Sequence, residues 1–214
     1  SNKLKVAGTR LRTTYIQAKK LMFHATIPGK VTIEFSNTGK KDYDRILYVN
    51  GVETTAKSKN QDHVTYSIVV PAGDVVIQAW EKAAQPEDET WNLLNIYSLS
   101  FSMADYIRTG LTVGSLGTIC LPSNVPAGYA FGATFYELVG KEPQYGKIVF
   151  DEVSGELVEG KPYLFQAQSD VLYCFYGTES VSDPDNSGAM KGTFVNLTLT
   201  NLTNIYYFAQ KALW

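Results

Sequence analysis

The sequence predicts an all-β protein built as two tandem β-sandwich domains, and three observations lead to that prediction. Short segments in which apolar and polar residues alternate recur along the chain, as half-buried strands require. Gly, Pro, Asn and Asp separate these segments at the spacing of sandwiches and barrels. The one stretch rich in helix formers, residues 81–89, is interrupted by Pro86, so no helix longer than two turns is expected.

The first half contains six expected strands, and the clearest of them is residues 31–35. Val31, Ile33 and Phe35 alternate there with polar residues, which places the three apolar side chains on one face. Asn50-Gly51 predicts a tight type I′ hairpin, because that turn needs a positive φ at both central residues. The six expected strands are residues 21–27, 31–35, 45–49, 63–70, 74–80 and 93–101.

The strand pattern lapses over residues 103–110, which we interpret as a linker or a short irregular crossover. The expected domains are therefore 1–105 and 106–214. Regular strand spacing resumes afterwards and predicts a second sandwich or barrel. Its seven expected strands lie in residues 111–122, 129–140, 147–153, 161–167, 171–177, 192–200 and 206–214.

Charge and hydropathy exclude several classes of protein. The formal net charge is -2, from 19 basic and 21 acidic residues, and no basic cluster is present, so nucleic acid is not an expected partner. No apolar run reaches the roughly 20 residues of a membrane-spanning helix, and residues 1–10 do not resemble a signal peptide. Ser1-Asn2 is typical of a tag-removal scar, and Trp214 ends the chain within an apolar run. We therefore expect a segment of a longer protein with further domains.

The sequence offers no catalytic constellation, so no enzyme is predicted. His24 and His63 lie in the first half and Cys120 and Cys174 in the second. Zinc-binding H-E-x-x-H and C-x-x-C motifs and the G-x-S-x-G hydrolase motif do not occur. Cys120 and Cys174 are either two buried thiols or one disulfide, and the sequence leaves both open.

No cofactor is predicted, although residues 183–188 begin like a calcium loop. Oxygen-bearing side chains occupy its first, third and fifth positions and Gly its sixth. An EF-hand needs Glu at its twelfth position, where this chain has Phe194. A surface turn is therefore expected, with calcium as the alternative.

Aromatic residues provide the candidate binding site. Trp80 and Trp91 lie at the two ends of an acidic segment, and Tyr43 lies between Asp42 and Asp44. If exposed, these rings would stack on a flat ligand such as a sugar; the alternative is that both Trp side chains close the sandwich core. The expected hydrogen-bond partners for sugar hydroxyls are Asp42, Asp44, Glu89 and Asn92.

Two resemblances to known families agree with this interpretation. The first half resembles the jelly-roll β-sandwich modules found beside secreted pectate lyases, through the segments VTIEF, the strand ending in Asn-Gly, and NIYSLSF. This resemblance implies a carbohydrate-binding-like shape. The second half is similar to a C-terminal β-sandwich domain of exported surface proteins of gut commensal bacteria, through GTICLP, ATFYEL and GKPYLFQ. This second resemblance implies an extracellular or cell-surface location and a domain that continues beyond residue 214.

We therefore expect a non-catalytic accessory or adhesive module of an exported surface protein that binds glycan weakly. Two alternatives stay open at this point. One is a structural spacer or assembly subunit that accepts a strand from a neighbour at a sheet edge. The other is a glycoside-active enzyme that uses Asp42 or Asp44.

Overall fold

The structure is a computed structural model of residues 1–214. It describes residues 5–7, 10–11, 15–38, 44–59, 61–81, 93–142, 147–177, 181–185, 187, 190, 192, 208–209 and 212–213.

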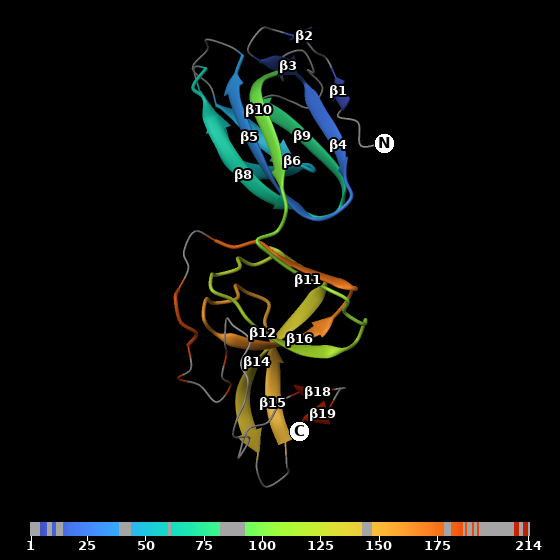
Figure 1. Cartoon of the computed structure of the whole chain (residues 1–214). Coiled ribbons are helices and arrows are strands. Elements are labelled where there is room, and N and C mark those ends of the chain that lie inside the picture. The colour runs from blue at the N-terminus through green and yellow to red at the C-terminus, as the bar shows by residue number, and fades with distance from the viewer. Residues whose placement is uncertain are drawn as a thin grey trace. The chain divides into compact units, whose positions relative to one another are not determined.

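The chain forms two compact units, residues 1–103 and 104–214, and the described residues of both contain only strands, turns and loops (Figure 1). This confirms the all-β prediction. In the first unit the strands are β1 (Lys5–Ala7), β2 (Arg10–Leu11), β3 (Ile16–Ala18), β4 (Lys20–Ala25), β5 (Gly29–Asn37), β6 (Arg45–Val49), β7 (Val52–Ser58), β8 (Val64–Val70), β9 (Gly73–Glu81) and β10 (Leu94–Ser102). In the second unit they are β11 (Tyr106–Thr109), β12 (Leu116–Cys120), β13 (Ala130–Phe131), β14 (Ala133–Glu142), β15 (Lys147–Glu152), β16 (Pro162–Ala167), β17 (Val171–Cys174), β18 (Phe208–Ala209) and β19 (Ala212–Leu213).

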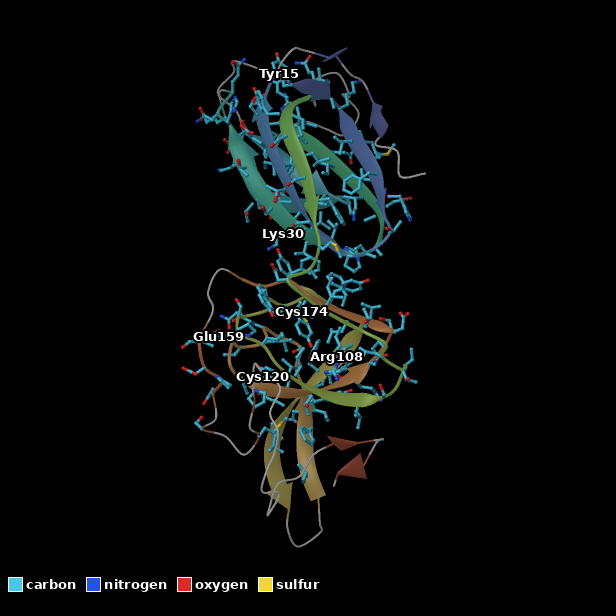
Figure 2. The ribbon with its side chains drawn as sticks, viewed as in Figure 1. Tyr15, Lys30, Arg108, Cys120, Glu159 and Cys174 are labelled. Carbon is cyan, nitrogen blue, oxygen red and sulfur yellow. The ribbon has the colours of Figure 1, made fainter. Side chains whose placement is uncertain are left out.

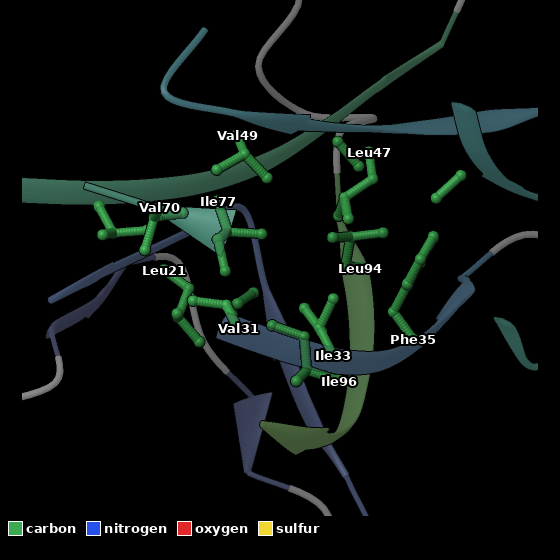
Figure 3. Close-up of a cluster of buried hydrophobic side chains, with 14 of the residues drawn as sticks. Leu21, Val31, Ile33, Phe35, Leu47, Val49, Val70, Ile77, Leu94 and Ile96 are labelled. Carbon is green, nitrogen blue, oxygen red and sulfur yellow. The ribbon is translucent and has the colours of Figure 1, made fainter. Parts of the chain in front are cut away.

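The first unit is a sandwich of two antiparallel sheets. One sheet has the order β1-β4-β9-β6-β7 and the other the order β2-β3-β10-β5-β8. Side chains from both sheets meet in one buried cluster, which includes Leu21 and Ile77 from the first sheet and Ile33 from the second (Figure 3). We refer below to the β2-β3-β10-β5-β8 sheet as the second sheet.

Strand β5 shows why the alternating sequence forms this core. Val31, Ile33 and Phe35 are at most 1% exposed, as their spacing predicts, while Thr32 and Glu34 alternate with them and remain partly exposed. Full burial of one such apolar side chain contributes about 1.5–3 kcal/mol. The core therefore fixes which face of β5 is left to solvent.

The predicted tight turn is confirmed. Asn50 and Gly51 have φ values of 51° and 79°, and Val49 pairs with Val52 across the hairpin. The Asn50 side chain also accepts a hydrogen bond from the amide of Val76 at 2.8 Å, which joins the hairpin to the neighbouring strand β9.

The second unit has its own buried core between a sheet of order β12-β16-β14-β15 and a sheet of order β11-β17-β13. Strands are found in six of the seven expected segments. One of these, residues 206–214, contains two short strands, β18 and β19, which pair with each other. Within the expected segment 192–200 only residue 192 is described.

The expectation of a linker or irregular crossover over residues 103–110 was wrong. Residues 106–109 form β11, which pairs antiparallel with β17. The alternation was missed because Arg108 takes an inward position that an apolar residue would normally hold. Its guanidinium lies 5.2 Å from the ring centre of Phe165 and donates a hydrogen bond to the carbonyl of Thr118.

The two cysteines are free thiols, so the disulfide alternative is not realised. Cys174 is fully buried, and Cys120 is partly exposed with its Sγ 3.1 Å from the carbonyl oxygen of Gly160. Burial raises the pKa of the Cys174 thiol to about 12, which keeps it protonated and unreactive near neutral pH.

Candidate functional site

One end of the first unit gathers strand ends from both sheets (Figure 1). In the second sheet, β5 ends where β10 begins, with Asn37 opposite Leu94. In the other sheet, β6 begins where β9 ends, with Arg45 opposite Glu81. We call this the loop end of the first unit.

A buried polar contact ties the two sheets together at the loop end. The backbone N–H of Asn37 donates a hydrogen bond of 2.9 Å to Oγ of Ser58. The Ser58 hydroxyl in turn donates one of 2.6 Å to the backbone carbonyl of Asp62. Residues 39–43 stand between β5 and β6 in the sequence, and residues 82–92 stand between β9 and β10. The described strand ends on both sides of each segment therefore lie at this same end.

Asp44 is the one predicted site residue whose side chain is described. It lies just before β6, and one of its carboxylate oxygens is 2.9 Å from Nζ of Lys57. The two side chains are 31% and 62% exposed, so the pair contributes at most about 1 kcal/mol. Among the described residues, this ion pair engages one of the two acceptor oxygens of the Asp44 carboxylate.

Trp80 is described only as part of the backbone of β9, where it pairs with Ile46 of β6. Its side chain lies outside the described residues, so its role as a stacking ring stays a prediction. The other predicted site residues also lie outside the described residues: Asp42, Tyr43, Glu89, Trp91 and Asn92.

The outer face of the second sheet carries a polar network beside the loop end. At its centre lies Asn95, only 6% exposed, whose side-chain amide donates to Oγ of Ser36 at 3.2 Å and accepts from Gln17 at 3.2 Å. Ser36, which is fully buried, lies 3.0 Å from the hydroxyl of Tyr97. A buried chain of hydrogen bonds therefore fixes the position of a partly exposed aromatic ring.

Three rings gather above this network. The imidazole of His63 stacks on Tyr97 with ring centres 3.9 Å apart and an angle of 28° between the planes. Tyr15 lies on Tyr97 with centres 5.4 Å apart and planes inclined at 54°. Figure 2 shows Tyr15 at the loop end of the unit and Lys30 at the opposite end.

Glu34 completes the group from the neighbouring strand β5. Its Oε1 is 2.9 Å from Nδ1 of His63, and its Oε2 accepts a longer hydrogen bond of 3.5 Å from the hydroxyl of Ser98. His63 is 54% exposed and Glu34 35% exposed, so a ligand in solvent can reach both. We call Tyr15, Tyr97, His63 and Glu34 the ring cluster.

The ring cluster was not predicted, although the sequence carries a signal for it. Apolar residues occupy positions 94 and 96 and then 99 and 101, so the period of two breaks once. In the structure the pairing with β5 shifts between Ile96 and Ser98. Tyr97 is the extra residue of this β-bulge, which places Tyr97 and Ser98 together on the outer face.

The second unit contains a cleft of about 180 Å³, with room for about six water molecules. Its floor is formed by Val125, Phe135 and Leu157, which are buried, and its rim includes Thr134, Glu152 and Ser154. Among the described residues that line it, Glu152 is the one with an ionisable side chain, whereas glycoside hydrolysis uses a pair of carboxylates.

The predicted surface turn at residues 183–188 is described in part. Oδ1 of Asp185 accepts a hydrogen bond from the amide of Ser187, and the Asp185 amide donates to the carbonyl of Gly160. Among the residues that the structure describes, no group of three or more His, Cys, Asp or Glu side chains is placed to hold a metal ion. Calcium stays an untested alternative.

Several solved structures of carbohydrate-binding modules are similar to this chain. A family 35 module from an environmental isolate is 18% identical, with a TM-score of 0.29 over 48% of this chain and 81% of that one. The family 35 module of Abf62 from Cellvibrio japonicus is 19% identical, with a TM-score of 0.28 over 47% and 80%. A tandem of two family 22 modules of Xyn10C from Paenibacillus barcinonensis is 9% identical, with a TM-score of 0.30 over 84% of each chain.

No protein-family model matches the sequence, and no curated protein matches it. A search of the described part of the chain for a helix long and apolar enough to cross a membrane finds none.

Proposed function

We propose that the chain is a non-catalytic accessory or adhesive module of an exported cell-surface protein and that its first unit binds glycan weakly at the loop end. The observation that carries this proposal is that the described strand ends on either side of segments 39–43 and 82–92 lie at one end of the sandwich. Tyr43 and Trp91 belong to these two segments, and we propose that they contribute rings to one binding region together with the acidic residues around them in the sequence. Rings and carboxylates are the groups that pack against sugar rings and accept hydrogen bonds from sugar hydroxyls.

The expected affinity is low. An enclosed ring buries about 150–250 Å², worth roughly 4–6 kcal/mol at about 25 cal/mol per Å², and a ligand covers only one of its faces. After the cost of association, one or two rings give a Kd in the millimolar to high-micromolar range. A parent protein would use such a module through repetition or tethering.

A glycan array of plant and host oligosaccharides, probed with the chain displayed in many copies, tests this proposal. We expect binding to a limited set of glycans, weakened at least tenfold by Trp91→Ala or Trp80→Ala. Thr55→Ala, an exposed change in β7 away from the loop end, is the control that should bind as the unchanged chain does. Silence across the whole array would contradict the proposal.

Asp44 provides a separate test of the non-catalytic part. Its contact with Lys57 is that of an exposed ion pair, and no second carboxylate is described in contact with it. We therefore expect no turnover of chromogenic glycosides. Turnover that disappears in Asp44→Asn would show that the chain is an enzyme.

One observation favours a second candidate, an assembly subunit. Strand β15 lies at the edge of its sheet in the described part of the second unit, and Ile148 on β15 and Val139 on its partner β14 are exposed by 39% and 49%. An open edge with apolar side chains can pair with a strand of another copy. An apparent molecular mass that rises with protein concentration in light scattering would support this candidate, provided that the rise disappears in Ile148→Lys.

A further inference from the structure

We propose that the ring cluster on the outer face of the second sheet is a second sugar-contact surface, and that it takes a soluble, uncharged oligosaccharide. This inference rests on the proposed glycan-binding function and adds to it a site made entirely of described residues. The four side chains come from separate parts of the sequence: Tyr15 precedes β3, His63 precedes β8, Glu34 lies in β5 and Tyr97 in β10.

The first step is that the aromatic surface is held in place before any ligand arrives. The Tyr97 hydroxyl contacts Ser36, and Asn95 holds Ser36 while it is itself held by Gln17. Ser36 and Asn95 are buried beneath the ring, where a hydrogen bond left unmade is costly. A ring that is already fixed loses little conformational entropy on binding, which favours affinity at a small surface.

The second step is that the cluster combines the groups that a sugar needs. The imidazole of His63 has Tyr97 against one face and is 54% exposed, so it presents an open ring surface to the C–H groups of a sugar. The Glu34 carboxylate beside it is in contact with His63 and Ser98. A carboxylate has about four acceptor sites, and its contacts with described residues use two of them, so we infer that the others accept hydrogen bonds from sugar hydroxyls.

The third step concerns the class of ligand. His63 stacks face to face on Tyr97, so the ring face that it offers to a ligand is the outer face of one imidazole. One small ring face fits one or two residues of a soluble chain and does not match the extended flat face of a crystalline polysaccharide. Glu34 brings a negative charge, and a second negative charge placed beside it is repelled. Uncharged sugars are therefore favoured over uronic acids.

The test uses the full chain and measures affinity for soluble xylopentaose, mannopentaose, cellopentaose and pentagalacturonate by isothermal titration calorimetry. We expect at least one neutral pentaose to bind better than pentagalacturonate. His63→Ala and Glu34→Gln should each weaken that binding by about fivefold to tenfold, the loss of one ring contact or one charged acceptor.

The matched control is Ser100→Ala. Ser100 is exposed and lies on the same outer face as Ser98, two residues further along β10, where it pairs with Thr32. Removal of the Ser100 hydroxyl should therefore leave the affinity unchanged. Tyr97→Phe is a second probe, because it keeps the ring and removes only the contact with Ser36. Thermal unfolding of each variant checks that the fold is retained.

The outcomes separate this inference from the proposed function. Binding that Trp91→Ala abolishes and that His63→Ala and Glu34→Gln leave unchanged would overturn the ring cluster and keep the loop-end site. Pentagalacturonate bound as tightly as the best neutral pentaose would overturn the assignment to uncharged sugars. Absence of binding to every probe and to the glycan array would overturn both.

Discussion

At the residue scale, Asn95 is the polar side chain on which most of the ring cluster depends. It is 6% exposed and joins Gln17, Ser36 and the carbonyl of Asn37. We expect Asn95→Ala to lower the free energy of unfolding by about 1–3 kcal/mol, because it leaves buried polar partners unsatisfied. Urea denaturation measures this loss, and Ser100→Ala should change the midpoint little. Equal midpoints for the two variants would show that the network adds no stability.

Cys174 and Cys120 are predicted to differ in reactivity. Cys174 is fully buried with a pKa raised to about 12, whereas Cys120 is partly exposed and its pKa is raised less, chiefly by partial burial. Iodoacetamide near neutral pH should label Cys120 first and Cys174 only after unfolding. Mass spectrometry of peptides from the labelled chain measures both rates. Rapid labelling of Cys174 in the folded protein would contradict its burial.

Tyr176 gives the second unit a predicted dependence on alkaline pH. Burial, with a further contribution from Cys174, raises the pKa of Tyr176 from 10.0 to about 12. From about pH 10 to about pH 12 the unfolded chain releases this proton and the folded chain keeps it, so stability falls as pH rises. Tyr176→Phe should make the fall of the urea midpoint across this range shallower. An unchanged slope would show that Tyr176 does not contribute.

At the element scale, the β6–β7 hairpin depends on backbone conformations that few residues adopt. Gly51 has a φ of 79°, and the space around it is open, so a substitution there tests conformation and not packing. We expect Gly51→Ala to cost about 1–2 kcal/mol. Gly51→Asn should cost much less, because Asn tolerates the left-handed region. Similar losses for the two variants, measured by urea denaturation, would contradict this explanation.

The elements differ in how far the sequence could predict them. Strand β5 was predictable because its inward side chains at positions 31, 33 and 35 are apolar, and the turn after β6 because Asn-Gly is the residue pair that its geometry requires. Strand β11 was not, since Arg108 takes an inward position through its contacts with Phe165 and Thr118. Such a position depends on a distant strand, which no local pattern reveals.

At the scale of the whole molecule, the chain has two separate cores, one in each compact unit. Sequence patterns predicted two sandwiches because each half alternates enough apolar residues to fill its own core. The location of a binding surface was harder to predict. The ring cluster brings together Tyr15, Glu34, His63 and Tyr97, which lie in or directly before four different strands. Whether these side chains meet depends on how the strands pair, which the local sequence does not show.

The central claim is that the first unit binds glycan at its loop end and at the adjoining ring cluster. The most direct measurement is an NMR titration of the isotope-labelled full chain with the neutral pentaose that binds best. We predict that the amide signals that shift lie mainly in residue 15 and in residues 34–44, 58–66 and 80–98, with signals of the second unit unchanged. Shifts confined to the second unit, or no shift at millimolar ligand, would contradict it.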